Sequence, residues 1–413
     1  MENSKGALRH LWAAIQVFRR SEAQLSAVDK ANMIPVHEVI LRFDFLAQKL
    51  LPYATSSFSR CSDLAFMEFP FWSRQPSVFS ALTQSDSITT ERHRLIQLVC
   101  GHNKLSRVVW GCWSPTSERP SRDELIGYYS EMLLWKATSP ATFTSCPPLD
   151  GVHPSCIADF DTLPMPPQPL QLTSSDAAVN IMMFNGYLGC ALATISTTDE
   201  DPIAREIECF NLVYQSLCIS AGLVYKDNGQ TPGNYKPCDA LDMGISIFLY
   251  HGARLCFSLD WQKWTITALH SIGREGLSNA HASANTLEIM CQIATTSNDN
   301  LSFGRSIAPA KSPLGSIRDR LFPLLMPRGD DDEFLAYFLR YGATEADSDE
   351  SIVRIVGRAT WKQDESGTMQ SLEVDSYHST DARAMSLPDE SGTMNLFSSW
   401  RQSVEHGWHG FLS

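Results

Sequence analysis

The feature that most constrains this fold is a hydrophobic period of 3.6 residues that runs through most of the chain. Its first instance places five apolar side chains on one helix face: Leu8, Leu11, Trp12, Ile15 and Phe18. Further helices are predicted over about 35–50, 91–113, 121–136, 174–195, 202–222, 239–258, 260–276, 280–295 and 314–326. Alternation typical of a strand is weak and confined to Ile352–Val356. The sequence therefore predicts an all-α, multi-helix domain with long irregular loops.

Several predicted helices carry local start signals. Ser121 followed by Glu124 is a capping-box pattern, because the hydroxyl and the carboxylate can each accept a bond from a free backbone amide. The helix over 174–195 is preceded by small polar residues and is apolar almost all round, which predicts a central, buried helix. The acidic run Asp330–Glu333 opposes the positive end of a helix dipole, so we expect another helix to start there.

Two changes of composition divide the chain. Residues 138–172 are rich in proline, which cannot continue a helix, and are the best candidate for an internal boundary. Residues 342–395 are acidic and polar and contain the hexapeptide Asp-Glu-Ser-Gly-Thr-Met twice, at 364–369 and 389–394. We therefore predict an N-terminal helical part (1–137), a Pro-rich connector (138–172), a helical core (173–341), an acidic flexible linker (342–395) and a C-terminal docking helix (396–413).

The charge balance argues against direct binding of nucleic acid. The net charge is −13, from 33 Lys plus Arg against 46 Asp plus Glu. Contact with a polyanion depends on basic side chains that displace condensed counterions. The densest basic spots are only Arg19-Arg20 and Arg92-His93-Arg94, which we interpret as solvated helix faces.

The eleven cysteines are scattered, and no two form a Cys-x-x-Cys pair, the spacing by which most small zinc sites present two thiolates. Cys209 and Cys218 are the closest pair. We therefore expect buried, reduced cysteines rather than a disulfide framework. The N-terminus lacks the pattern of a signal peptide, and no uninterrupted apolar run reaches the ~18 residues of a membrane span. These observations predict a soluble intracellular protein.

Three groups of residues could carry chemistry, and each has a simpler interpretation. Asp330–Glu333 could hold magnesium against a diphosphate, but a hard cation needs a second cluster of oxygen ligands, and only a polar linker and a terminal helix follow. His406 and His409 lack an evident third zinc ligand, and His251 is interpreted as a helix-packing residue. Nucleotide and nucleophile motifs are absent. We therefore predict no catalytic, cofactor-binding or metal-binding residue, no cofactor and no enzyme.

Four segments, in this order, carry a resemblance to a known family: Leu8–Arg20, Val39–Phe58, Trp261–Leu277 with its continuation Ala282–Met290, and Trp400–Phe411. In the third segment Trp261, Trp264, Ala268 and Ile272 share one helix face, and Gly273 or Gly276 supplies the C-cap. Together they resemble the C-terminal regulatory domain of fungal binuclear zinc-cluster transcription factors, also called the fungal-specific transcription factor domain.

The resemblance implies a nuclear regulator of a fungal pathway or secondary-metabolite gene cluster. Family members carry an N-terminal six-cysteine zinc cluster, and none of the cysteines here can be assigned to it, so we expect no DNA binding by this chain alone. It would act through a DNA-binding regulator or the transcription machinery as protein partner, or through a small-molecule effector. Two alternatives stay open. One is a helical small-molecule-binding protein or biosynthetic enzyme whose pocket is lined by residues 174–195, and the other is a gene model that lacks an upstream zinc-cluster exon.

Overall fold

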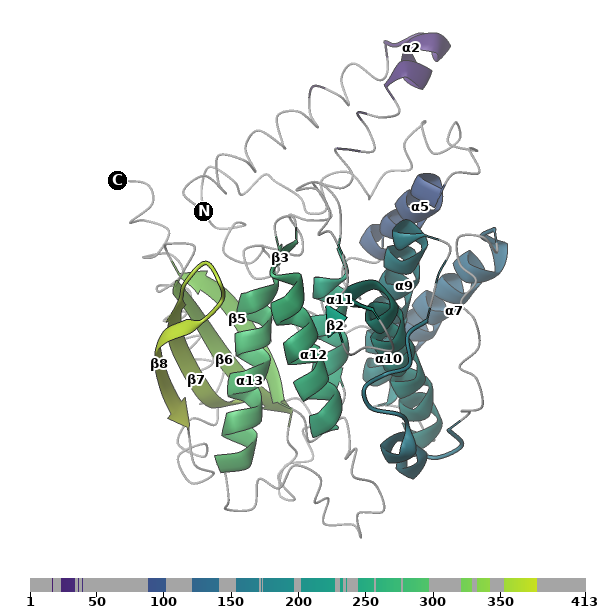
Figure 1. Ribbon diagram of the computed structural model, residues 1–413. Helices are drawn as coiled ribbons and strands as arrows, with labels where there is room; N and C mark the ends of the chain where they lie inside the picture. The colour runs from purple at the N-terminus through teal and green to yellow at the C-terminus, as the bar shows by residue number, and fades with distance from the viewer. Residues whose placement is uncertain are drawn as a thin grey trace, which may run out of the picture.

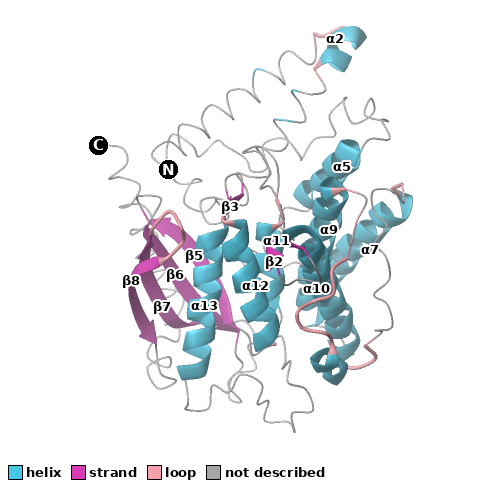
Figure 2. Cartoon of the chain, viewed as in Figure 1, coloured by secondary structure: helices cyan, strands magenta, loops and turns pink. Residues whose placement is uncertain are grey.

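The computed structural model describes residues 24–33, 88–101, 121–140, 154–170, 172, 174–196, 202–226, 231–232, 235, 244–255, 258–275, 278–296, 321–328, 333–341 and 353–376, with single residues at 17, 36 and 39. This part of the chain is mostly helical and carries a four-stranded sheet at one side (Figures 1 and 2). From the sheet across the molecule, the main elements are α13, α12, α11, the pair α9 and α10, and finally α5 and α7 (Figure 1).

The centre of the helical part is the pair α9 (Ser175–Ser196) and α10 (Pro202–Val224), which make the most extensive contact between any two of the described helices. α9 is buried along almost its whole length, as its all-round apolar sequence predicts. The Nδ2 amide of Asn185 on α9 donates to Ser216 Oγ (3.2 Å) and Gln215 Oε1 (3.0 Å) on α10. Residues Ile203–Val224 have the length and hydropathy of a membrane-crossing helix, but 61% of their apolar window is buried in this core.

Two helices flank α9 on the side away from the sheet. These are α5 (Ile88–Gly101) and α7 (Arg122–Thr138). The predicted capping box of α7 is confirmed, since the Glu124 N–H donates to Ser121 Oγ (3.2 Å) and the Ser121 N–H to Glu124 Oε2 (2.6 Å). A short helix, α2 (Ala27–Asn32), lies at the top of Figure 1, away from the sheet.

The described part of the Pro-rich connector packs against α10 and α12. Its 3₁₀ helix η2 (Ile157–Thr162) buries Phe160 edge-on against Phe210 and Trp261. Further along, the Tyr214 hydroxyl donates to the carbonyl of Pro164 (2.8 Å), and the Leu170 N–H donates to the carbonyl of Cys218 (2.9 Å). One hydrophobic core extends from Leu95 to Trp361, so the connector crosses the surface of a single core rather than separating two.

Three helices lie between this pair and the sheet: α11 (Ser246–Leu255), α12 (Leu259–Ile272) and α13 (Ala280–Thr296). α12 begins at Ser258, whose hydroxyl accepts from the Trp261 N–H, and ends at Gly273, whose φ of 74° confirms the predicted glycine cap. A small hairpin of β3 (Arg274–Glu275) and β4 (Ser278–Asn279) then leads into α13. A second short pair, β1 (Tyr225–Lys226) and β2 (Thr231–Pro232), follows α10.

The sheet is an antiparallel meander of β5 (Leu321–Arg328), β6 (Glu333–Tyr341), β7 (Val353–Gln363) and β8 (Met369–Ser376), in that order. One face packs on α13, with contacts from β5, β6 and β7. Buried residues recur with the strand period of two at Phe334, Ala336 and Phe338 on β6 and at Ala359 and Trp361 on β7. Phe334 and Trp361 are paired across the strands, and their rings stack at 5.5 Å.

The described residues are mostly helical, in rough agreement with the predicted all-α class, but they also include this sheet. The predicted helix over 314–326 is wrong where the structure describes it, because residues 321–328 form the strand β5. Pro323 and Pro327 explain this difference. Proline cannot donate a helical hydrogen bond, but it is tolerated on an edge strand, and β5 is one edge of the sheet. The predicted helix start at Asp330–Glu333 is also wrong, since Glu333 opens β6, whose sequence is rich in aromatic residues that favour a pleated surface.

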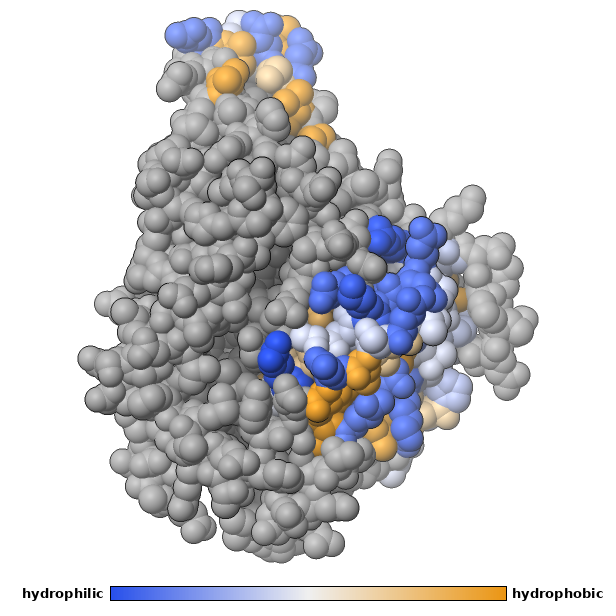
Figure 3. Space-filling view, turned by 90° about the vertical axis from the view of Figure 1, so that its left-hand side faces the viewer, coloured by the Kyte–Doolittle hydropathy of each residue, from blue (hydrophilic) through white to orange (hydrophobic). Residues whose placement is uncertain are grey.

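The predicted flexible linker over 342–395 is contradicted where the structure describes it. Residues 353–376 form β7, a tight turn and β8, and the weak strand pattern at Ile352–Val356 marks the beginning of β7. The second hexapeptide, at 389–394, and the predicted docking helix over 396–413 lie outside the described residues. On β8, the other edge strand, Leu372 and Val374 remain 38% and 39% exposed. Apolar residues lie among polar ones on this side of the molecule (Figure 3).

The expected burial of cysteines is confirmed for Cys190, Cys209 and Cys218, which lie in the core between α9 and α10. Cys291 is half-buried on α13, where its thiol donates to Gln262 Oε1 of α12 (3.3 Å) and burial raises its pKa to about 11. Cys156, in the connector, is exposed.

We expect Gly222→Ala to destabilise the protein, because a Cβ at this position would lie 2.2 Å from the carbonyl oxygen of Leu170 and force the connector off α10. The expected loss is about 1–3 kcal/mol in the free energy of unfolding, measured by urea denaturation. Gly127→Ala on α7 is the matched control. Nothing lies within 4 Å of its added methyl, so it should leave stability unchanged or raise it by about 0.5–1 kcal/mol. Equal effects of the two changes would contradict the docking of the connector.

Candidate functional site

Titratable and hydroxyl side chains from separate parts of the chain meet where α12 turns into α13. We call this region the α12–α13 corner and define it by Tyr235, Ser246, His270, Glu275, Ser278 and His281. The corner lies between the N-terminus of α11, the β3–β4 hairpin and the turn that joins β7 to β8. It is where the helical part meets the sheet.

Glu275 is the buried charge of the corner, with 2% of its surface exposed. Its Oε2 accepts from the backbone N–H of Ser246 at 2.7 Å, and its Oε1 accepts from the Tyr235 hydroxyl. Ser246 is the first residue of α11, so the carboxylate lies at the positive end of that helix dipole and accepts one of its free amides. A nearby hydrogen bond joins Ser246 Oγ to Ser278 Oγ at 3.1 Å.

The close approach of Glu275 requires glycine at position 244. A Cβ there would lie 1.5 Å from the Glu275 Cδ, so any other residue would displace the carboxylate. Both carboxylate oxygens already accept protein donors, and the group is enclosed. A general base must reach the proton that it abstracts. Glu275 is therefore placed to join α11, β3 and Tyr235 rather than to act on a substrate.

The second feature of the corner is the histidine pair, His270 at the end of α12 and His281 in the first turn of α13. Their Nδ1 atoms are 3.2 Å apart, and both rings are half-buried. A hydrogen bond at this distance needs one Nδ1 to carry a proton and the other to accept it. Burial lowers the pKa of both histidines, and for His281 the charges of His270 and Arg274 lower it further, whereas Asp364 raises it.

The β7–β8 turn lies directly on His281. Gly367 has a φ of 83°, and a Cβ on it would lie 2.2 Å from the His281 Cγ, so both the backbone conformation and the space select glycine. Within the turn, Asp364 Oδ1 accepts from the N–H groups of Ser366 and Thr368 and from the Ser366 hydroxyl. These bonds, with that of Ser366 foremost, lower the pKa of Asp364.

Buried amides tie this turn to α13. The Nδ2 of Asn285 donates to Gln363 Oε1 (2.9 Å) and to the Gly367 carbonyl (3.0 Å). Gln363 Oε1 also accepts from the indole of Trp361 (3.3 Å), and Gln363 Nε2 donates to Asn279 Oδ1 (3.4 Å). Since all five residues in these four bonds are at least partly removed from water, each lost bond would leave a polar group of low exposure unsatisfied.

The corner offers two imidazoles to a metal ion, which falls short of the three or four protein ligands of known zinc sites. Within the residues that the structure describes, no group of three or more His, Cys, Asp or Glu side chains is arranged to hold a metal. The arrangement supports hydrogen bonding between elements and proton uptake by the histidine pair.

The residues considered above as candidates for catalysis or metal binding lie elsewhere in the chain. His251 is buried on α11 with its ring 5.3 Å from that of Tyr250, and the guanidinium of Arg254 lies 5.6 Å from the Tyr250 ring. Glu333 is the first residue of β6, while Asp330–Asp332, His406 and His409 lie outside the described residues. The corner brings none of these together.

Sequence reasoning missed His270, Glu275 and His281 as a group. One signal was available: Glu275 lies between Gly273 and Gly276, directly after an amphipathic helix, which marks a carboxylate on a tight turn. The partners of Glu275 are distant in the sequence, so this signal could not have named Tyr235 or Ser246.

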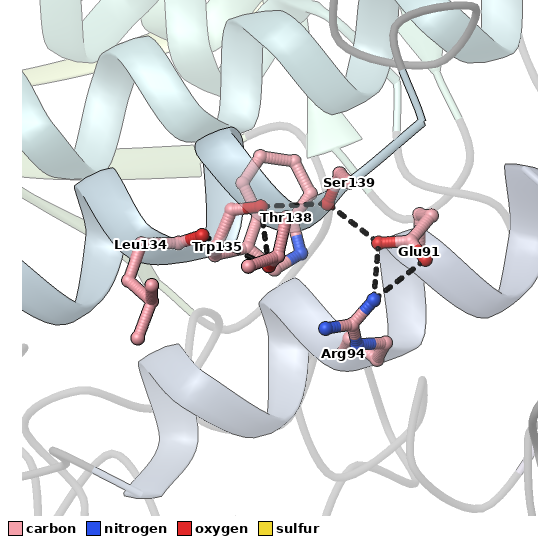
Figure 4. Close-up of polar contacts among 6 residues, drawn as sticks. All are labelled: Glu91, Arg94, Leu134, Trp135, Thr138 and Ser139. Atoms are coloured by element: carbon pink, nitrogen blue, oxygen red, sulfur yellow. Dashed lines mark hydrogen bonds and ion pairs between the residues drawn. The ribbon is translucent and has the colours of Figure 1, made fainter.

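The interpretation of the basic triplet Arg92-His93-Arg94 as a solvated helix face is wrong for Arg92, which is buried, whereas the side chain of Arg94 is 43% exposed. Arg92 is 2% exposed and donates to Asn180 Oδ1 (2.8 Å) and Asp176 Oδ1 (2.7 Å) on α9. Arg94 donates to both oxygens of Glu91, at 2.8 and 3.0 Å, and Glu91 Oε2 accepts from the Ser139 hydroxyl at the end of α7 (Figure 4). Both arginines thus join helices or neutralise a buried carboxylate.

The apolar stripe of α9, weighed above as the wall of a pocket, belongs to the hydrophobic core. Its members are each at most 4% exposed: Ile181, Met182, Met183, Phe184, Tyr187 and Leu188. Phe184 stacks on Trp135 of α7 at 5.7 Å, and Lys136 lies over its ring at 5.1 Å. These contacts favour the interpretation of the stripe as packing.

No family model, no curated protein and no solved structure matches this chain.

We expect Glu275→Gln to lower the free energy of unfolding by about 1–3 kcal/mol, because an amide in this place offers only one acceptor oxygen to the two donors around it. Urea denaturation at pH 7 measures the change. Glu365→Gln, an exposed residue of the β7–β8 turn, removes the same charge and should stay within about 0.5 kcal/mol of the wild type. A Glu275 variant as stable as this control would contradict the anchoring role.

We expect Gly367→Ala to loosen the β7–β8 hairpin, since the added methyl would overlap the His281 ring and the positive φ is strained for alanine. Hydrogen exchange of the backbone amides in 369–376 should become faster, while exchange in α9 and α10 stays at the wild-type rate. Unchanged exchange in β8 would show that the turn does not depend on this contact.

Proposed function

We propose that the protein is a regulator of transcription that lacks its own DNA-binding zinc cluster and acts through a protein partner or an effector. In this proposal the chain is the regulatory domain, built of many helices with long irregular loops, and it works in the nucleus on the genes of a fungal pathway. The resemblance of its helix segments to the regulatory domain of fungal zinc-cluster factors motivates the class.

The burial of Arg92 and its ion pair with Asp176 are the observation that most strongly supports the proposal. Arg92 belongs to one of the densest basic spots of the sequence, yet it is buried and paired with Asp176, and its neighbour Arg94 is paired with Glu91. A buried arginine paired in this way, as Arg92 is, is not available to a phosphate, whereas the side chain of Arg94 remains partly exposed. The net charge of −13 points in the same direction.

The place of the segment Trp261–Leu277 also supports a scaffold role. Trp261, Ala268 and Ile272 are buried in the core, and Gly273 and Glu275 turn the chain into α13. The described residues of this segment therefore belong to the core and to the turn between α12 and α13, while the other three segments that carry the resemblance lie largely outside the described residues. Residues that pack and turn are what a regulatory scaffold needs.

The first test is binding of the full chain to fluorescent duplex DNA, measured by anisotropy at about 0.15 M salt, where non-specific binders retain only weak affinity. We expect no saturable binding below micromolar concentrations. Tight binding with sequence preference would overturn the proposal.

The second test separates the proposed regulator from a biosynthetic enzyme. Deletion of the gene in its host should change transcript levels of a defined set of genes, measured by RNA sequencing and restored by the reintroduced gene. A deletion that removes one metabolic product while transcripts stay at wild-type levels would instead favour the enzyme alternative.

A further inference from the structure

We propose that the histidine pair is an acid-sensitive latch: protonation of His270 and His281 releases the β7–β8 hairpin from α13. The inference concerns the fold itself and does not depend on the proposed function. It starts from the position of His281, which contacts His270 on one side and the Gly367 turn on the other.

The geometry makes the latch responsive to two protons rather than one. In the neutral pair, one Nδ1 donates to the other across 3.2 Å. A single added proton can be shared between the two rings. A second proton makes both Nδ1 atoms donors and places two positive charges at hydrogen-bonding distance, so the bond is lost and the rings repel each other. The two histidines therefore titrate as a coupled pair.

The charges around the pair come from each element that packs on it. α12 supplies His270, α13 supplies His281, β3 supplies the exposed Arg274, and the β7–β8 turn supplies Asp364. The carboxylate of Asp364 favours the protonated form of His281, but it also accepts three bonds within its own turn. Glu275, the other nearby carboxylate, is directed to Tyr235 and Ser246. Arg274 and the neighbouring imidazole oppose protonation.

The lowered pKa values of the two histidines determine how the stability of the closed corner changes with pH. The pKa of each histidine is lowered in the folded protein, so below the ordinary value of about 6.5 the open or unfolded state binds more protons than the closed state. The stability of the closed corner is thus fully present above that value and is lost as the pH falls through the lowered pKa values.

The β7–β8 hairpin is the element that separates from α13 when the histidine pair is protonated. His281 supports Gly367, and Gly367 and Gln363 are joined to α13 through Asn285. Movement of the charged His281 ring therefore acts directly on the turn. The α9–α10 pair packs against α11 and α12 and lies farther from the sheet than α13 does (Figure 1). Acid should loosen β7 and β8 first.

The experiment is hydrogen exchange with mass spectrometry on the full chain at pH 7.5 and 5.5, corrected for the intrinsic pH dependence of exchange. We expect protection in 353–376 to fall several-fold at pH 5.5, while protection in α9 and α10 is retained. Equal protection of the hairpin at both values, or an equal fall in α9 and α10, would overturn the proposal.

Two surface variants test the charge dependence without touching the rings. Arg274→Gln removes the cation that opposes protonation of His281, so the acid-induced loss of hairpin protection should become smaller. Lys263→Gln, an exposed residue on α12, makes the same charge change at a place that does not act on either histidine. It should leave the loss unchanged. If the two variants behave alike, a local latch is excluded.

The double variant His270→Gln with His281→Gln provides the final test, because two amides can form one hydrogen bond but take up no proton. Its hairpin protection should be the same at pH 7.5 and 5.5. A wild-type fall that persists in this variant would assign the pH response to other groups.

Discussion

The bond between the side-chain amides of Asn285 and Gln363 is the interaction on which the union of helices and sheet depends. It lies in a buried place, where a lost partner costs about 1–3 kcal/mol of desolvation. Apolar packing of Phe334 and Trp361 brings the sheet to α13 but is non-directional. The amides add direction, since Gln363, which also accepts from the indole of Trp361 on its own strand, can meet Asn285 of α13 in one register only. A slip of one residue would turn Gln363 to the opposite face of the sheet.

The same principle explains three other buried polar groups among the described residues. Glu275 joins the start of α11 to β3, Arg92 joins α5 to α9, and Asn185 joins α9 to α10. Each group is paired with a residue distant in the sequence and fixes how two elements meet. These side chains stabilise contacts between elements of the fold, which agrees with the proposal of a regulatory scaffold.

The helices could be predicted because their signals are local. The capping box at Ser121, the apolar stripe of α9 and the glycine after Ile272 each determine structure within a few residues. The strands β5 and β6 differ from the predicted helices because a short apolar run does not distinguish a buried strand from a helix by periodicity alone. Pro323 and Pro327 are the local signals that favour a strand in β5. The α12–α13 corner could not have been predicted, since Tyr235 and Ser246 are 40 and 29 residues away from Glu275 in the sequence.

The position of the meander in the sequence has a consequence for folding during translation. All four of its strands follow α13, so a ribosome completes every described helix before it begins the sheet. At about 5–20 residues per second, the apolar flank of α13 stays bare for several seconds while residues 297–376 are translated. During that interval the nascent chain exposes the apolar surface of α13 that the sheet covers in the folded protein. Transiently exposed apolar surface of this kind makes a chain prone to associate with other molecules until the sheet has formed.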